Sequence, residues 1–197
     1  MGIGKQAKIV NEHQLQALLA WLETRKHATR NRLIVLLSFK AGLRAKEIAS
    51  LKWSMIMTAD GNIGDHIHLT NEASKGKSRR IIALNKELKK QLIKAREIDG
   101  INIADAGRSV IKTQRGQGTT AQVIVNSFAE WYRKLGFVGC SSHSGRRSFI
   151  TQAARKASLV GGSLRDVQAL AGHASLATTS RYIAIDAEAQ QKLVNII

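Results

Sequence analysis

Residues 66–84, HIHLTNEASKGKSRRIIAL, decide whether this chain is entirely helical or mixed. Ile67 and Leu69 alternate with polar neighbours, which is the two-residue period of a half-buried strand. A basic turn, residues 74–78, separates them from the apolar run that extends from Ile81 to Leu84. This order predicts a small antiparallel sheet with Lys75 on the hairpin between its strands.

Helical periodicity dominates the sequence before this stretch. Asn11 and Gln14 form a potential capping pair for a helix whose apolar face consists of Leu15, Leu18, Leu19 and Leu22. Residues 30–40 predict a buried helix that Gly42 closes. A further short helix is expected from Ala45 to Leu51.

The sequence after the predicted sheet is also largely helical. Asn85 is expected to cap a helix that runs to about Ile98, and residues 100–118 predict a loop with one short strand, Ser109 to Lys112. Thr119 or Thr120 should begin a helix that Gly136 ends. From Ser142 onward the pattern is helical, with breaks at Gly161-Gly162 and Gly172. The predicted fold is mainly α with a small antiparallel β-sheet (α+β), in a single domain over residues 1–197.

The chain carries a large positive charge, because 31 Lys and Arg oppose 14 Asp and Glu, for a net charge of +17. The basic residues run through the whole sequence rather than forming one tail. Nucleic acid is the favoured partner, since a cation that meets a phosphate releases condensed counterions. A solubilising surface or an anionic membrane surface are the weaker alternatives.

The sequence predicts a cytoplasmic protein. No apolar run approaches the length of a membrane span, and the N-terminus lacks the apolar core of a signal peptide. The single cysteine, Cys140, cannot form an internal disulfide, which fits a reducing compartment.

Four short groups of residues stand out from the helical background. They are residues 41–48 (AGLRAKEI), the Lys75 turn, residues 143–146 (HSGR), and residues 170–173 (LAGH) with 178–182 (TTSRY). Each group alone has an ordinary structural explanation, such as a solvated arginine or a glycine that ends a helix. Their joint occurrence in this order is the informative feature.

The ordered set resembles the catalytic domain of tyrosine recombinases, also called phage-type integrases. That family has an arginine in a Gly-Leu-Arg turn, a hairpin lysine, His-x-x-Arg, Gly-His, and a tyrosine nine residues later. His173 and Tyr182 are separated by this step, and the resemblance extends from Leu15 to about Ile185. It implies the fold of that catalytic domain and site-specific DNA recombination of the integrase or invertase type, without metal or ATP.

The resemblance also assigns the phosphate chemistry. Tyr182 would attack phosphorus, which gives a covalent 3′-phosphotyrosine and a free 5′-hydroxyl. Arg44 and Arg146 would clamp the phosphate, because a guanidinium offers permanently charged, bidentate donors.

Three further residues would move protons or stabilise charge. His143 would accept the tyrosine proton as general base, and Lys75 would protonate the departing 5′-oxygen, with Lys77 as its substitute. His173 would donate a hydrogen bond to the phosphate in the transition state.

Four residues are candidates for binding DNA: Lys77, Arg115, Thr119 and Arg147. Arg115 and Thr119 flank a glycine-containing loop before a helix, and Arg147 follows the second motif arginine, where relatives commonly carry histidine. No metal or other cofactor is expected. His66 and His68 share a strand face, but neither a cysteine pair nor a His-Glu-x-x-His motif accompanies them.

The resemblance implies double-stranded DNA as the partner and assembly on it, as a dimer at each site and a tetramer at the synapse. It also allows for accessory DNA-bending proteins, in a nucleoid-associated protein of bacterial or phage origin. We expect no separate N-terminal core-binding domain, as in compact, catalytic-domain-only recombinases such as the fimbrial-switch invertases. The segment from Asp186 to Ile197 is expected to form a short helix, which packs either on its own core or on a neighbouring protomer.

Three other functions compete with this hypothesis. A type IB topoisomerase shares the Arg/Lys/Arg/His/Tyr set and would relax DNA of any sequence without partners. A non-catalytic DNA-binding regulator of the same fold would only bind, although no catalytic position is substituted here. A general basic RNA- or ribosome-binding protein would leave no special role for Tyr182.

Overall fold

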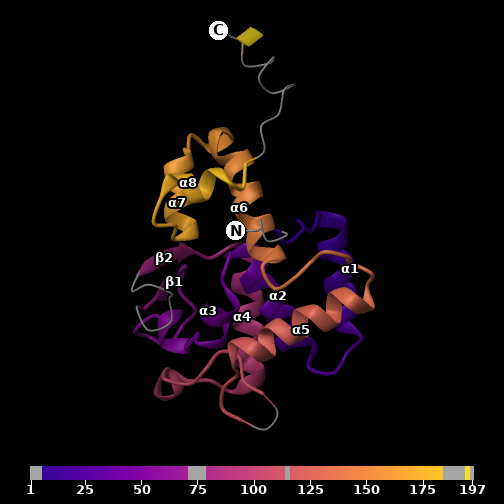
Figure 1. Ribbon diagram of the computed structural model, residues 1–197. Helices are drawn as coiled ribbons and strands as arrows, with labels where there is room; N and C mark the ends of the chain where they lie inside the picture. Colours follow the sequence, from indigo (N-terminus) through magenta and orange to yellow (C-terminus); the bar gives the residue numbers. More distant parts are fainter. Residues whose placement is uncertain (1–5, 71–78, 114–115, 184–193, 196–197) are drawn as a thin grey trace. The chain divides into compact units, whose positions relative to one another are not determined.

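A computed structural model describes residues 6–70, 79–113, 116–183 and 194–195 of the chain (Figure 1). The chain divides into two compact units, one up to Phe149 and one from Ile150. The boundary lies inside helix α6 (Ser144–Lys156).

The first unit is mainly helical. Its elements in chain order are α1 (Glu12–Glu23), α2 (Ala28–Lys40), α3 (Ala45–Ala49), η1 (Trp53–Met55), β1 (His66–Leu69), β2 (Arg80–Ala83), α4 (Lys86–Asp99), η2 (Ile103–Asp105), α5 (Ala121–Lys134) and the start of α6. The strands β1 and β2 pair antiparallel, with Ile67 opposite Ile82 and Leu69 opposite Arg80. The predicted fold class, mainly α with a small antiparallel sheet, is confirmed.

The two-stranded sheet has one buried and one exposed face. Ile67, Leu69 and Ile82 are buried, whereas His66 and His68 are exposed, with their rings edge to face at 6.2 Å. This is the alternation that the sequence predicts, and it places both histidines on the outer strand face.

The core of the first unit forms around α2. This helix packs against α1, α3 and α4, and every residue from Leu33 to Leu37 is at most 2% exposed. Five successive apolar residues cover every side of a helix, so this stretch of α2 needs neighbours on all sides, which explains why α2 is central.

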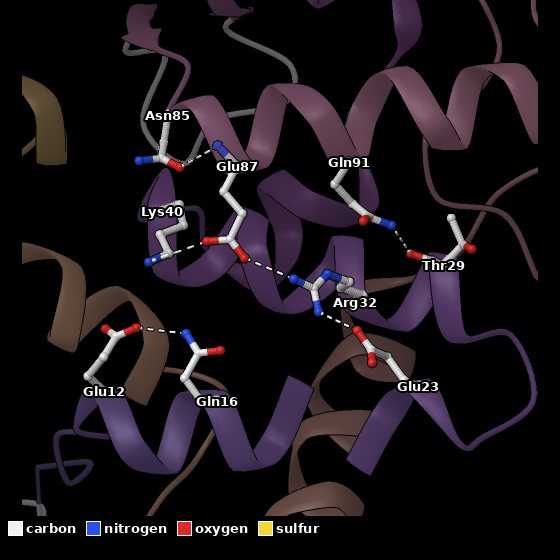
Figure 2. Close-up of polar contacts among 9 residues, drawn as sticks. All are labelled: Glu12, Gln16, Glu23, Thr29, Arg32, Lys40, Asn85, Glu87 and Gln91. Carbon is white, nitrogen blue, oxygen red and sulfur yellow. Dashed lines mark hydrogen bonds and ion pairs between the residues drawn. The ribbon is translucent and has the colours of Figure 1, made fainter. Parts of the chain in front are cut away.

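Polar residues join α1, α2 and α4 at the edge of this core, as Figure 2 shows. Glu87 accepts a hydrogen bond from Arg32 at 2.9 Å and forms an ion pair with Lys40 at 3.6 Å. Arg32 also donates to Glu23 at 2.9 Å. Asn85 caps α4 by accepting from the Glu87 backbone N–H at 2.9 Å, in agreement with the predicted helix start.

The prediction of a strand from Ser109 to Lys112 is wrong. Ser109 makes only an isolated bridge to Lys52, and the Val110 N–H donates to the Leu51 carbonyl at 2.8 Å. Val110 and Ile111 are 4% and 1% exposed, so the apolar run is a loop that belongs to the core. A short apolar run in a sequence predicts that its residues are buried, but burial alone does not distinguish a strand from a loop in the core.

The second unit comprises the remainder of α6, η3 (Ala157–Val160), α7 (Leu164–Ala171) and α8 (Leu176–Ser180) within the described residues. Gly161 ends η3 and Gly172 ends α7, so both predicted breaks are confirmed. The helix α7 packs against α8. The predicted C-terminal helix, Asp186 to Ile197, lies almost wholly outside the described residues.

Within the part of the chain that the structure covers, no helix has the length and apolarity needed to cross a membrane.

Candidate functional site

The two motif arginines of the first unit are anchored at the loop between α2 and α3. Gly42 adopts a φ of 62°, which glycine tolerates because it has no Cβ, and Arg44 then occupies the N-cap position of α3. Arg146, in the first turn of α6, donates from Nη1 to the Gly42 carbonyl at 2.6 Å. The structure therefore brings Arg44 and Arg146 to the same three-residue segment of backbone.

A buried carboxylate holds Arg44. Glu47, in α3, has no exposed surface and accepts from Arg44 Nη1 at 2.9 Å and from the Arg44 backbone N–H at 2.8 Å. The same carboxylate accepts two hydrogen bonds from Arg80 at the start of β2, at 3.1 and 3.0 Å. Neither Glu47 nor Arg80 was among the predicted site residues. A glutamate three residues after a helix N-cap forms one half of a capping box and could have identified Glu47, whereas Arg80 has no local signal.

Gly145 determines how closely α6 approaches α2. A Cβ at this position would collide with Ser38 Oγ and would stand 2.7 Å from Phe39 Cδ2. Glycine is therefore required one residue before Arg146, and this close packing fixes the position of the Arg146 backbone relative to α2.

His143 immediately precedes α6 and has an exposed imidazole. Its backbone N–H donates to Ser141 Oγ at 3.3 Å, and its carbonyl accepts from the Arg147 N–H at 2.9 Å as the helix starts. His143 thus lies immediately before the first turn of α6, and Arg146 lies within that turn.

The predicted DNA-binding residues are placed in different ways. Arg147 is half-buried and donates from Nη1 to the Ala7 carbonyl at 3.0 Å, so it secures the segment before α1. Thr119 is half-buried directly before Thr120, which is the N-cap of α5. The remaining predicted residues, Lys75, Lys77 and Arg115, lie outside the described residues.

His173 and Tyr182 lie together in the second unit. Their rings are stacked, with centroids 5.4 Å apart and an interplanar angle of 24°. His173 Nδ1 lies 3.0 Å from Oγ1 of the fully buried Thr179, which fixes the orientation of the imidazole. The Tyr182 N–H donates to the Thr179 carbonyl at 3.0 Å, and Thr151 Oγ1 donates to the Tyr182 carbonyl at 3.2 Å. One buried threonine therefore aligns both predicted site residues of this unit.

The chemical capacity of these groups is clear from their types. The first unit supplies two guanidinium groups and an exposed imidazole at one loop and helix end. The second supplies a phenol stacked on an oriented imidazole. Among the described residues, no three His, Cys, Asp or Glu side chains gather where they could hold a metal ion.

Comparison with known proteins identifies the family and the fold. Residues 8–189 match the phage integrase family. Tyrosine recombinase XerC from Lactobacillus delbrueckii subsp. bulgaricus is 31% identical over 158 residues, which cover 78% of this chain and 50% of that protein. The chain therefore spans about half the length of the curated relatives it matches.

Solved structures share the fold. The crystal structure of XerA recombinase has a TM-score of 0.73 at 22% identity, covering 95% of this chain and 64% of that one. The Tn1549 transposon integrase in complex with circular intermediate DNA has a TM-score of 0.74 at 18% identity, covering 100% and 68%. Identities at this level establish the fold alone. The family match over residues 8–189 shows that the chain belongs to the phage integrase family of tyrosine recombinases.

Proposed function

We propose that this chain is a site-specific DNA recombinase that cuts and rejoins strands through a covalent 3′-phosphotyrosine at Tyr182. The stacking of Tyr182 on His173 is the observation that carries this proposal. It pairs a phenol that can attack phosphorus with an imidazole that can donate to a phosphate. XerC is named a tyrosine recombinase and the Tn1549 integrase was solved with DNA, which supports DNA as the substrate.

In the proposed reaction the Tyr182 oxygen forms a bond to the scissile phosphorus, and the bond from phosphorus to the 5′-oxygen breaks. His143 takes the phenol proton, and Lys75 gives a proton to the departing 5′-oxygen. One phosphoester bond replaces another, so a 5′-hydroxyl can later displace Tyr182 without ATP. This exchange lets a strand be rejoined to a new partner.

Arg44, Arg146 and His173 stabilise the phosphate in this scheme. Arg146 is 4% exposed and the Arg44 side chain 28%, so their charges act where water screens them little. Guanidinium groups remain charged at all physiological pH values, which suits them to a phosphate that gains negative charge during attack.

The proposal extends to the complex on DNA. Lys77, Arg115, Thr119 and Arg147 would contact double-stranded DNA, and Arg147 would do so beside its bond to Ala7. Two protomers would bind each site, and four would meet at the synapse. Accessory DNA-bending proteins would assist this assembly.

Covalent trapping tests the nucleophile. The full chain is incubated with nicked suicide duplexes drawn from the DNA that flanks its gene, and adducts that survive denaturation are counted. The chain has only two tyrosines, so Tyr132→Phe is a matched control for Tyr182→Phe. We expect an adduct from the wild type and Tyr132→Phe, and none from Tyr182→Phe. An adduct that persists in Tyr182→Phe would overturn the assignment.

Two further results would favour the competing functions. Relaxation of supercoiled plasmid of any sequence by a monomer would indicate a type IB topoisomerase. Tight binding to the duplexes without an adduct from any variant would indicate a non-catalytic regulator.

A further inference from the structure

A three-residue charge network lies directly behind Arg44. Glu47 Oε1 accepts from Arg44 Nη1 at 2.9 Å and from Arg80 Nη1 at 3.1 Å. Glu47 Oε2 accepts from the Arg44 N–H at 2.8 Å and from Arg80 Nη2 at 3.0 Å. Two positive charges therefore share one carboxylate that has no exposed surface.

The two arginines of this network differ in side-chain exposure and in the number of hydrogen bonds that their guanidinium groups donate to Glu47. The Arg80 side chain is 6% exposed and its forked guanidinium binds both carboxylate oxygens, which fixes the plane of the carboxylate. Arg44 offers one guanidinium nitrogen to Glu47, and its side chain is 28% exposed. Arg44 is thus the partner that can turn toward a ligand while Arg80 stays in place.

We infer that Arg80 is a positioning residue for Arg44, an inference that rests on the proposed role of Arg44 in binding the scissile phosphate. When the Arg44 guanidinium turns to a phosphate, Glu47 keeps Arg80 as its counter-charge. Without Arg80, that movement would leave the buried Glu47 carboxylate with no positive partner, which is strongly disfavoured. Glu47 would therefore keep Arg44 in its ion pair and away from the phosphate. The bond from the Arg44 backbone N–H to Glu47 keeps the helix start fixed throughout.

The contact between Arg80 and Glu47 also secures β2, the strand that follows the predicted hairpin. Arg80 is the first residue of β2 and lies five positions after Lys75 in sequence. A single carboxylate therefore anchors both the start of α3 and the start of β2.

The test compares four variants of the full chain in single-turnover adduct formation on the nicked suicide duplexes. Arg80→Met removes the counter-charge, Arg80→Lys retains it without the fork, and Arg80→Met with Glu47→Gln removes both charges. Arg32→Met is the matched control, because the Arg32 side chain donates to two glutamates, Glu23 and Glu87, neither of which is a proposed site residue (Figure 2). Each rate is measured below the melting temperature of that variant and normalised to its folded fraction.

We expect Arg80→Met to slow adduct formation by about 10- to 100-fold with little change in the dissociation constant for the duplex. Arg80→Lys and the double variant should recover much of the rate, and Arg32→Met should keep it. The double variant also keeps the test decisive if Arg80→Met alone folds poorly. A wild-type rate in Arg80→Met, or no recovery in the double variant, would overturn the inference.

Rescue by the conservative variant separates positioning from a purely structural role. Arg80→Lys keeps a cation beside the buried Glu47 carboxylate, so it should recover adduct formation although the forked contact is lost. A rate in Arg80→Lys as low as that in Arg80→Met would contradict positioning. Absence of any adduct from the wild type would instead overturn the proposed function, and this inference with it.

Discussion

Tyr132 is buried with no hydrogen-bond partner for its hydroxyl in the part of the chain that the structure describes. Its ring packs against Phe128 and Phe137 at centroid distances of 5.7 and 6.0 Å. Burial holds the pKa of Tyr132 well above its usual range, so the phenol stays neutral and its donor unsatisfied. This tyrosine is part of the core, in contrast to Tyr182.

Tyr132→Phe should therefore stabilise the protein. Removing an unsatisfied buried hydroxyl is expected to raise the free energy of unfolding by about 1 kcal/mol, because the desolvation cost disappears and the ring packing remains. Urea denaturation of the two proteins measures the difference. A loss of stability of similar size would show that the hydroxyl has a partner after all.

Gly145→Ala should have the opposite effect. The new Cβ would press on Ser38 and Phe39, and overpacking of this kind costs about 1–3 kcal/mol of unfolding free energy. Gly107→Ala is a suitable control, since a Cβ there meets nothing within 4 Å. Thermal melts should show a clear loss for Gly145→Ala alone. Equal melting temperatures for the two variants would contradict the tight approach of α6 to α2.

At the scale of elements, the start of α4 depends on one side chain. Asn85 accepts from the Glu87 N–H at 2.9 Å, and Asn85→Ala should lower the unfolding free energy by about 1 kcal/mol. Asn85→Asp retains the acceptor and adds a negative charge at a helix N-terminus, so it should preserve stability. Denaturation curves for the three proteins test this order, and a destabilised Asn85→Asp would argue against capping.

Elements with local signals could be predicted from the sequence, and contacts between distant elements could not. The α1 start was predictable because Asn11 and Gln14 cap each other three residues apart, and β1 because its side chains alternate. The order of motifs likewise identified Arg44, Arg146, His173 and Tyr182 as candidates. The role of Arg80 could not be predicted, because Arg80 and Glu47 are 33 residues apart in sequence and meet only once the sheet is placed.

The bond from Arg147 to Ala7 was unpredictable for the same reason, because the two residues are separated by 140 positions. Basic residues near a motif satisfy either a phosphate or a backbone carbonyl, and composition does not distinguish these partners. The strand prediction for Ser109 to Lys112 was wrong for a different reason. The apolar residues of this segment are buried in the core, but they do not pair with a strand.

At the scale of the whole molecule, the net charge of +17 predicts strong salt dependence of DNA binding. With roughly six to ten phosphate contacts, affinity for duplex DNA should fall by about 10³- to 10⁵-fold between 50 and 200 mM salt. Arg115→Ala should lower the slope of log affinity against log salt by about 1 if Arg115 contacts a phosphate. Fluorescence anisotropy across a salt series measures both. An unchanged slope would remove Arg115 from the interface.

The small core of the second unit has a consequence for lifetimes. Among its described residues the buried hydrophobic side chains are Ile150, Val167 and Ala171, fewer than α2 alone buries. Segments with few buried apolar contacts open locally at low free energy, so amides near Tyr182 should take up deuterium well before those of α2. We therefore expect the proposed nucleophile to lie in a segment that opens often. The fraction of time for which this segment stays closed would then set how often Tyr182 is ready to react.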